Sequence, residues 1–496
     1  MKKKIFYGCL ALVLAFALVF VSAPVQATCS SMAAGNKATA DKSVLFGHNE
    51  DDGPCPTLMH VVPRIYHEPG ETIELWNGGD LEQVVGETWA YLWSYMPGYA
   101  FSDTYLNEWG VAIASDASGS REPYPGDLTD GGITYWTRRV VAERAKTARE
   151  GVLLIGEMNE RFGYASSGRT LIVADPKEAW LVQQVRGRHW CAQRVPDDHV
   201  AFIPNRYTIR EVNLKDKKNF LASPGLIEHA IDMGWYDPAG GEPFEFAKAY
   251  GNITKMDTRQ WAALRLLTGI EYDPEEMAPF SVKPNRKLSV QDIIEVLRTH
   301  YEGTEYEPEW TEPYWPHEGD PRRICVGSTQ ESSVMQLRSK MPSFVGNVYW
   351  RAQCTPCSTV YSPWYSGILE IPKPYAVGKS NRSSAPPEYY DPDAADDMNS
   401  AYWAFRKMTD LVEEDYLARK ALVRDVWDEY EDAAFELQDR IEKTALEIYK
   451  GKKGKKGKKD EHNEYLARWF LTRQTESLAL NAYFKALEFI ELFEED

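Results

Sequence analysis

Short apolar segments separated by turn-forming residues dominate the chain ahead of residue 394. Segments rich in β-branched and aromatic residues, each bounded by Gly, Pro, Asn or Asp, are typical of β-strands. The pattern predicts strands at 43–47, 61–66, 92–96, 110–114, 170–174, 179–182 and 199–203. A further strand region is expected to open at 322–326 and to continue through 333–337 and 345–350 to 361–371.

Apolar residues recur at helical spacing in a second set of segments. They predict helices at 135–162, 260–268 and 290–300, and long amphipathic helices at 398–449 and 464–493. Strands, then a helical stretch, then strands again indicate an α+β fold with stacked layers. We expect one main domain over 28–394 and a helical region over 395–496. The Lys/Gly tract 450–459 should be a solvated loop between helices, with contact to a polyanion as the alternative.

The first 27 residues have the pattern of a secretory signal peptide. A basic segment at 2–4 precedes an apolar run at 5–20 and the cleavage motif Val25-Gln26-Ala27. The apolar run is shorter than the ~20 residues of a membrane span. We therefore expect a protein that is exported to the periplasm or beyond, without stable membrane insertion. Loss of three lysines makes the formal charge of −18 still more negative, which disfavours nucleic acid as a partner.

Cys29 follows the cleavage motif almost directly and begins a short apolar run. If processing makes Cys29 the first residue, its free α-amine can take the proton of its own thiol, because amine and thiol titrate in the same range. The polar group His48-Asn49-Glu50-Asp51 ends the next predicted strand. A hairpin would return this group to the side of Cys29, so Asp51 or a neighbour could reach the amine.

The other cysteines carry no comparable mechanism. Cys354-Thr-Pro-Cys357 fits a redox pair, half of a zinc site, a local disulfide or two thiols packed in the core. Because no second C-x-x-C and no H-x₃-H follows, we expect neither a metal nor another cofactor. Motifs of zinc proteases, serine hydrolases and nucleotide-binding proteins are missing from the sequence.

The segment from Cys29 to Asp51 resembles the start of the secernin-related cysteine dipeptidases of peptidase family C69. Further segments that match are 107–113, 173–180, 194–200 with 205–206, 322–324 leading to 336–338, 363–365 and 401–405. The resemblance implies an N-terminal nucleophile hydrolase with a four-layer αββα core, no cofactor, and dipeptides or small amides as substrates. A homo-oligomer remains open.

The resemblance also implies roles for individual residues. Cys29 would be nucleophile and base, Asp51 would hold its amine, and Asn205 would bind the oxyanion. His48 stands where the family has an arginine beside the thiol, and another arginine could supply that charge. Two arginines match the family pattern more weakly and are further candidates for the site: Arg206 and Arg322.

Thr28 departs from this pattern because cleavage after Ala27 would leave it in front of Cys29. An acyl shift or an aminopeptidase must then remove it. Three other functions remain open: an amidase for N-acyl amides of the penicillin V acylase and bile salt hydrolase type, a lipoprotein binding module anchored through Cys29, and a scaffold without catalysis. The residues before Cys29 fit a lipoprotein signal poorly.

Overall fold

Two antiparallel strands open the described part of the chain and form the hairpin that the sequence predicts. In the computed structural model, β1 (Ser30–Ala34) pairs with β2 (Val44–Glu50) in a register that sets Ser31 opposite His48. The structure describes residues 29–75, 77–98, 104–309, 315–451 and 461–495. The predicted signal peptide and residues 452–459 of the Lys/Gly tract lie outside these ranges.

The hairpin lies near one side of a six-stranded sheet. Its strands follow the order β14 (Val200–Ile203), β1, β2, β16 (Glu331–Leu337), β17 (Asn347–Gln353) and β18 (Ser362–Tyr365). Each neighbouring pair is antiparallel. The sheet thus joins strands from both ends of the predicted main domain.

A second sheet holds eight strands. Their order is β15 (Phe220–Ala222), β13 (Trp190–Arg194), β12 (Ala179–Gly187), β11 (Tyr164–Ala174), β10 (Ala112–Ala117), β9 (Tyr105–Asn107), β8 (Tyr91–Tyr95) and β3 (Leu58–Val62). Two small hairpin-like sheets lie outside it and pair β4 (Ile65–His67) with β7 (Gly86–Thr88), and β5 (Thr72–Glu74) with β6 (Asp80–Glu82).

Alternating side chains of the eight-stranded sheet enter two different cores. Ile113, Val173 and Val182 pack in a cluster with residues of α1 (Trp136–Arg144) and α2 (Ala148–Phe162). Their neighbours Ala114 and Ile172 belong to the larger cluster that includes β1 and β2. This period of two places the helices on one face and the other sheet on the opposite face.

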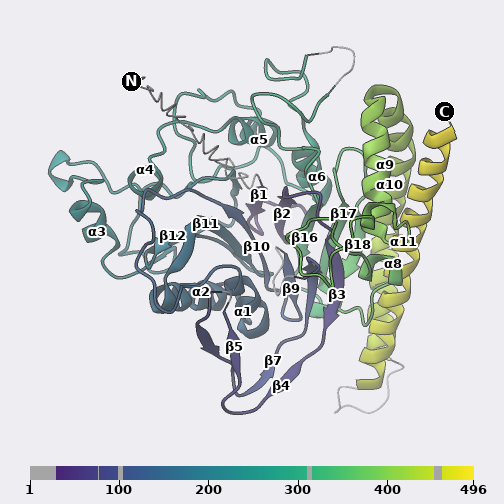
Figure 1. Cartoon of the computed structure of the whole chain (residues 1–496), viewed down its shortest axis with the longest axis horizontal. Coiled ribbons are helices and arrows are strands. Elements are labelled where there is room, and N and C mark those ends of the chain that lie inside the picture. The colour runs from purple at the N-terminus through teal and green to yellow at the C-terminus, as the bar shows by residue number, and fades with distance from the viewer. Residues whose placement is uncertain (1–28, 76, 99–103, 310–314, 452–460, 496) are drawn as a thin grey trace, which may run out of the picture.

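The outer face of the six-stranded sheet is covered by α5 (Thr258–Thr268) and α6 (Val290–Arg298), which contact β14, β2 and β16. The layers therefore run helix, sheet, sheet, helix (Figure 1). The expected α+β fold with an αββα core is confirmed. Short helices lie in the connections: α3 (Leu226–Asp232), α4 (Phe246–Gly251), α7 (Ser343–Gly346) and α8 (Lys373–Ala376).

The C-terminal region consists of helices, as expected. α9 (Ala401–Glu414), α10 (Tyr416–Lys450) and α11 (Glu461–Glu495) pack on one another and against β17 and β18 at the edge of the six-stranded sheet (Figure 1). Within the described ranges, no helix combines the length and the apolar content that a membrane span requires. The boundary at 394/395 stays a prediction.

Three predicted elements need correction. The helix at 135–162 is two helices, because the Thr147 side chain accepts a hydrogen bond from the Glu150 amide and begins a new one. The helix at 398–449 is likewise interrupted, at Asp415. Residues 322–326 form no strand; they lie in a loop, and the strand begins at Glu331.

Candidate active site

Cys29 lies at the start of β1, between the two sheets. Continuing the strand register places it beside Glu50 on one side and Asn205 on the other. Its side chain is buried, and its Sγ donates a hydrogen bond to Glu50 Oε2 at 3.5 Å. The hairpin therefore does bring the polar end of β2 back to the cysteine.

His48 lies on the same face of β2 as Glu50, toward the eight-stranded sheet. Its Nδ1 lies 2.8 Å from Ser31 Oγ and 4.0 Å from Asp116 Oδ1 on β10. Its Nε2 lies 3.3 Å from Glu50 Oε2. Burial by itself would lower the pKa of His48, but the Glu50 hydrogen bond and the charge of Asp116 raise it above its usual range. An imidazolium ion is thus favoured close to the thiol.

Two arginines add positive charge near this cluster, Arg138 from α1 and Arg169 from β11 of the second sheet. Arg138 and Arg169 each donate to Ser115 Oγ, at 2.6 and 2.8 Å. Burial by itself would raise the pKa of Glu50, but the His48 contact and these two guanidinium groups lower it. Burial raises the pKa of the neighbouring Asp116 to about 6, even with His48 nearby. That an arginine supplies the charge beside the thiol stays a prediction.

Asp51 follows β2 and faces away from His48. Its Oδ1 accepts a hydrogen bond from Thr329 at 2.6 Å, and its Oδ2 accepts one from Arg322 at 2.8 Å. Its backbone amide donates toward the Cys29 sulfur. Arg322 therefore holds the Asp51 carboxylate, and this ion pair is its link to the site.

Asn205 and Arg206 diverge although they are adjacent. Asn205 Oδ1 accepts a hydrogen bond from Arg259 Nη1 at 2.9 Å, and the same Nη1 donates to the Cys29 carbonyl at 2.9 Å. Asn205 Nδ2 is buried and has no hydrogen-bond partner among the described residues. Arg206 instead forms an ion pair with Asp257 at 3.3 Å. The structure therefore joins Asn205 to the cysteine and directs Arg206 elsewhere.

Burial raises the pKa of the Cys29 thiol well above its usual range, and the carboxylates of Glu50, Asp116 and Asp51 raise it further. The thiol is therefore neutral while its nitrogen belongs to a peptide bond. Glu50 is a poor base for it because its own pKa is lowered. The site holds a nucleophile that still needs a proton acceptor.

The family model of peptidase family C69 matches residues 121–429. A "probable dipeptidase" of Salmonella dublin is 31% identical over 377 residues, which cover 72% of this chain and 84% of the relative. The chain belongs to peptidase family C69. Another "probable dipeptidase", from Latilactobacillus sakei, is 28% identical over 79% of this chain and 82% of that protein.

Among solved structures, a mutant conjugated bile acid hydrolase from Clostridium perfringens is similar to this C69 chain over 66% of this chain and 89% of that one. Its identity is 12% and the TM-score is 0.31, a value that supports no conclusion about function. The family assignment of this chain therefore depends on the family model and on the relatives of higher identity.

Sequence reasoning missed three residues of this C69 site. Glu50 stands in the polar group that ends β2, and the alternation of the strand could have assigned it to the face of His48. Asp116 lies just beyond the strand predicted at 110–114, and the structure extends that strand to include it. Arg259 is separated from Cys29 by 230 positions, and no local pattern signals that contact.

The six described cysteines are all buried and free. Cys354 and Cys357 therefore form no disulfide with each other, and Cys357 Sγ lies 3.3 Å from His317 Nε2.

Proposed function

We propose that this C69 chain is an exported dipeptidase in which Cys29, once it is the first residue, acts as nucleophile and supplies the general base. The family and the names of its relatives support dipeptide hydrolysis. The observation that carries the mechanism is the position of Cys29, buried between the sheets beside a polar cluster in which Glu50 has a lowered pKa. An α-amine is the base that this cluster lacks.

The reaction would proceed through a thioester. The Cys29 amine takes the thiol proton while the sulfur attacks the peptide carbonyl, and the carbonyl oxygen becomes an oxyanion. The protonated amine then gives its proton to the leaving nitrogen, and the first amino product departs. Water, activated by the same amine, hydrolyses the thioester and regenerates the thiol.

The surrounding residues can stabilise the oxyanion and the thiolate that form during this reaction. Asn205 Nδ2 is an unpaired buried donor that can bind the oxyanion. Arg259 fixes both Asn205 and the Cys29 carbonyl through one nitrogen, which keeps donor and nucleophile together. The positive charges of His48 and the Ser115-linked arginines favour the thiolate when it forms.

Export follows from the signal pattern of residues 1–27 and is part of the same proposal. Signal cleavage must be completed by removal of Thr28, since an amide nitrogen at Cys29 is no base. The relevant test is the N-terminal sequence of the active protein, measured by mass spectrometry on material recovered outside the cytoplasm.

Two chains that differ by one residue give the sharpest test. A chain that begins at Cys29 should hydrolyse dipeptides, and a chain that begins at Thr28 should lose about 10²–10⁴ in kcat/KM because the base is lost. Cys29→Ala in the shorter chain should abolish turnover. Equal activity of the two chains would contradict the mechanism. Preference for N-acyl amino acids over dipeptides would contradict the substrate class.

A further inference from the structure

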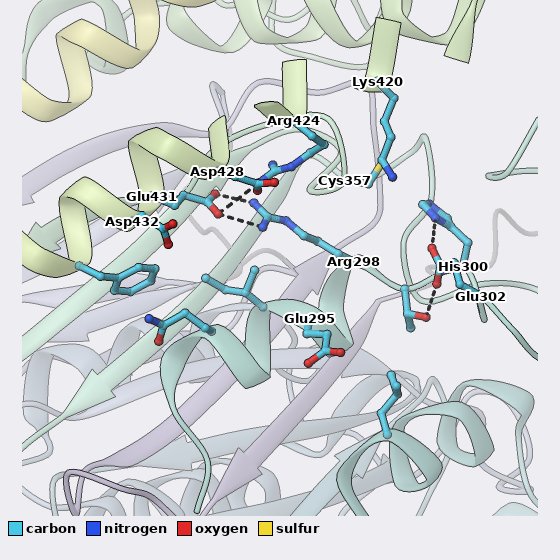
Figure 2. Close-up of a pocket in the computed structure, with 15 residues that line it drawn as sticks. Glu295, Arg298, His300, Glu302, Cys357, Lys420, Arg424, Asp428, Glu431 and Asp432 are labelled. Carbon is cyan, nitrogen blue, oxygen red and sulfur yellow. Dashed lines mark hydrogen bonds and ion pairs between the residues drawn. The ribbon is translucent and has the colours of Figure 1, made fainter. Parts of the chain in front are cut away.

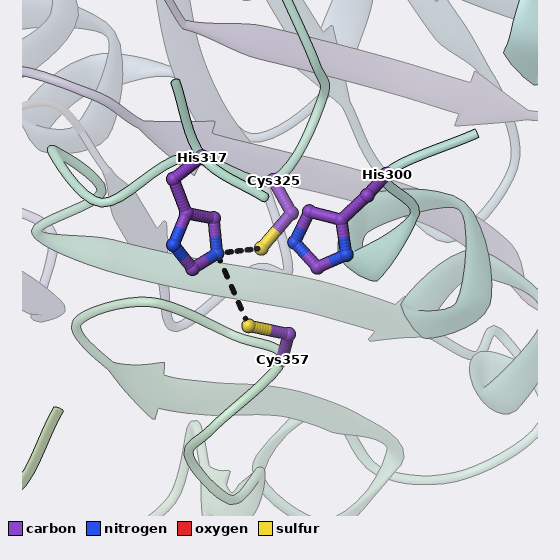
Figure 3. A group of neighbouring side chains, drawn as sticks. All are labelled: His300, His317, Cys325 and Cys357. Carbon is purple, nitrogen blue, oxygen red and sulfur yellow. Dashed lines mark hydrogen bonds between the residues drawn. The ribbon is translucent and has the colours of Figure 1, made fainter. Parts of the chain in front are cut away.

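Four side chains with metal-binding atoms meet at a second place in the molecule. His300, His317, Cys325 and Cys357 come from three separate segments, and their ligand atoms all lie within 4.8 Å of one another (Figure 3). His300 and the two cysteines are buried. None of the four belongs to the Cys29 site.

The spacing of these atoms fits a tetrahedral ion. His317 Nε2 lies 3.3 Å from Cys357 Sγ and 3.7 Å from Cys325 Sγ. Bonds of about 2.0–2.1 Å to nitrogen and about 2.3 Å to sulfur give a tetrahedral N···S edge of about 3.6 Å. Cys357 Sγ also accepts a hydrogen bond from the Tyr416 hydroxyl at 3.3 Å, a contact of the kind that stabilises a thiolate.

The outer nitrogens of both imidazoles are held by carboxylates. His300 Nδ1 lies 3.0 Å from Glu302 Oε1, and His317 Nδ1 lies 2.5 Å from Glu413 Oε1. His300 Nε2 is then left buried without a hydrogen-bond partner in the part of the chain that the structure describes. A carboxylate behind each histidine is the arrangement that orients metal-bound imidazoles.

We propose that these four residues bind one Zn²⁺ in a closed Cys₂His₂ site with a structural role. Two thiolates neutralise the charge of the ion, which suits a buried position, and sulfur ligands disfavour Mg²⁺ and Ca²⁺. Because the four ligands together have none of the spacings of zinc motifs, no local pattern predicts this site. The fold brings them together.

The ion would connect three parts of the molecule. His300 follows α6, Cys357 lies in the β17–β18 connection, and Glu413 belongs to α9. Cys325 lies between Arg322 and Thr329, the two residues that hold Asp51. The zinc would therefore also stabilise the loop that positions Asp51.

A route to the cluster exists from the side of the C-terminal helices. His300 and Cys357 line a cavity of about 790 Å³ between α6 and α10, together with Arg298 and Lys420 (Figure 2). A metal site needs such an entry path to fill.

The test is the metal content of the purified full chain, measured by mass spectrometry after growth with added zinc. We expect one zinc per chain, lost in Cys325→Ala and Cys357→Ala. Cys354→Ala is the matched control, since it removes a buried thiol three residues away, and it should retain the metal. Cys29→Ala should retain it too, which excludes the catalytic thiol as the ligand.

Cobalt keeps the proposal testable if a cysteine variant fails to fold. The unmodified chain loaded with Co²⁺ should show the visible absorption of a tetrahedral ion and a thiolate charge-transfer band, and chelation of zinc should lower its Tm. A chain without metal after loading, metal retained by both cysteine variants, or a disulfide between Cys325 and Cys357 would overturn the proposal.

Discussion

At the scale of single residues, the adjacent Asn205 and Arg206 lie in different surroundings. Asn205 continues from β14 to the side of Cys29, and its Nδ2 has no hydrogen-bond partner among the residues that the structure describes. Arg206 points to Asp257, half-buried and away from the thiol. An amide that can stabilise an oxyanion must be close and must have a free N–H, and only Asn205 satisfies both conditions.

Asn205→Ala should therefore lower kcat for dipeptides by about 10²–10³ with a smaller change in KM. Arg206→Ala, the adjacent control, should change kcat much less. Steady-state kinetics on chains that begin at Cys29 measures both. If kcat falls by a similar factor in the two variants, Asn205 is not the oxyanion donor.

His48 should make stability depend on pH. Its pKa in the folded chain is raised by Glu50 and Asp116 against the effect of burial. A raised folded pKa means that the stabilisation is complete below the unfolded value of about 6.5 and is lost as pH rises through the folded pKa. As the pH rises above about 6.5, urea unfolding should thus show a steeper fall in stability for the native chain than for His48→Gln.

His199→Gln is the control for this measurement, because His199 lies at the surface beside Asp198. It should leave the pH dependence of the unfolding free energy unchanged. If His48→Gln has the same pH dependence as the native chain, His48 does not carry the charge assigned to it.

At the scale of elements, the contact between β2 and α6 explains why a glycine stands in the middle of a buried strand. A Cβ at Gly47 would lie 2.5 Å from Ile293 Cγ2 and 3.1 Å from Met32 Cγ. The close approach lets Asn49 on the same face donate to the Leu297 carbonyl of α6. The helix thereby fixes the strand that carries His48 and Glu50.

Gly47→Ala should lower the free energy of unfolding by about 1–3 kcal/mol through overpacking. Gly119→Ala is the matched control: no heavy atom lies within 4 Å of its added Cβ. That substitution should be neutral or slightly stabilising, since alanine reduces the entropy of the unfolded chain. Urea unfolding measures the stability of both variants. Equal free energies of unfolding for Gly47→Ala and Gly119→Ala would contradict the packing argument.

Some element boundaries can be predicted from local sequence, and others cannot. The break at Thr147 has a local signature, Thr-x-x-Glu, that marks a helix start and was obscured by the continuous apolar pattern around it. The strand expected at 322–326 fails for another reason. Its Arg322 and Cys325 are oriented by contacts with distant residues, and apolar content alone does not form a strand without a partner edge.

At the scale of the whole molecule, α10 is tied to the main core by a buried carboxylate. Glu431 accepts a hydrogen bond from Arg298 Nη1 of α6 at 2.9 Å (Figure 2). It also accepts one from the Tyr361 amide at 2.8 Å. Arg424 of α10 donates to it as well, at 3.3 Å. The carboxylate thus joins two helices and a loop.

Glu431→Gln should cost about 3 kcal/mol of stability, because it leaves the half-buried Arg298 without its counter-charge. Limited proteolysis should then cut α10 and α11 sooner than in the native chain. Glu436→Gln, an exposed position on the same helix, should have no such effect. If Glu431→Gln is cut no faster than the native chain, other contacts hold these helices.

The sequence by itself determined the class of fold, the hairpin from Cys29 to Asp51, the helical C-terminal region and the family, because period, turn residues and motifs are local. The tertiary structure alone decided that Arg259 joins Asn205 to Cys29, that Arg206 turns away, and that His300, His317, Cys325 and Cys357 meet. These contacts join residues far apart in the chain, and their partners are chosen by sheet register and helix packing, which no short segment encodes.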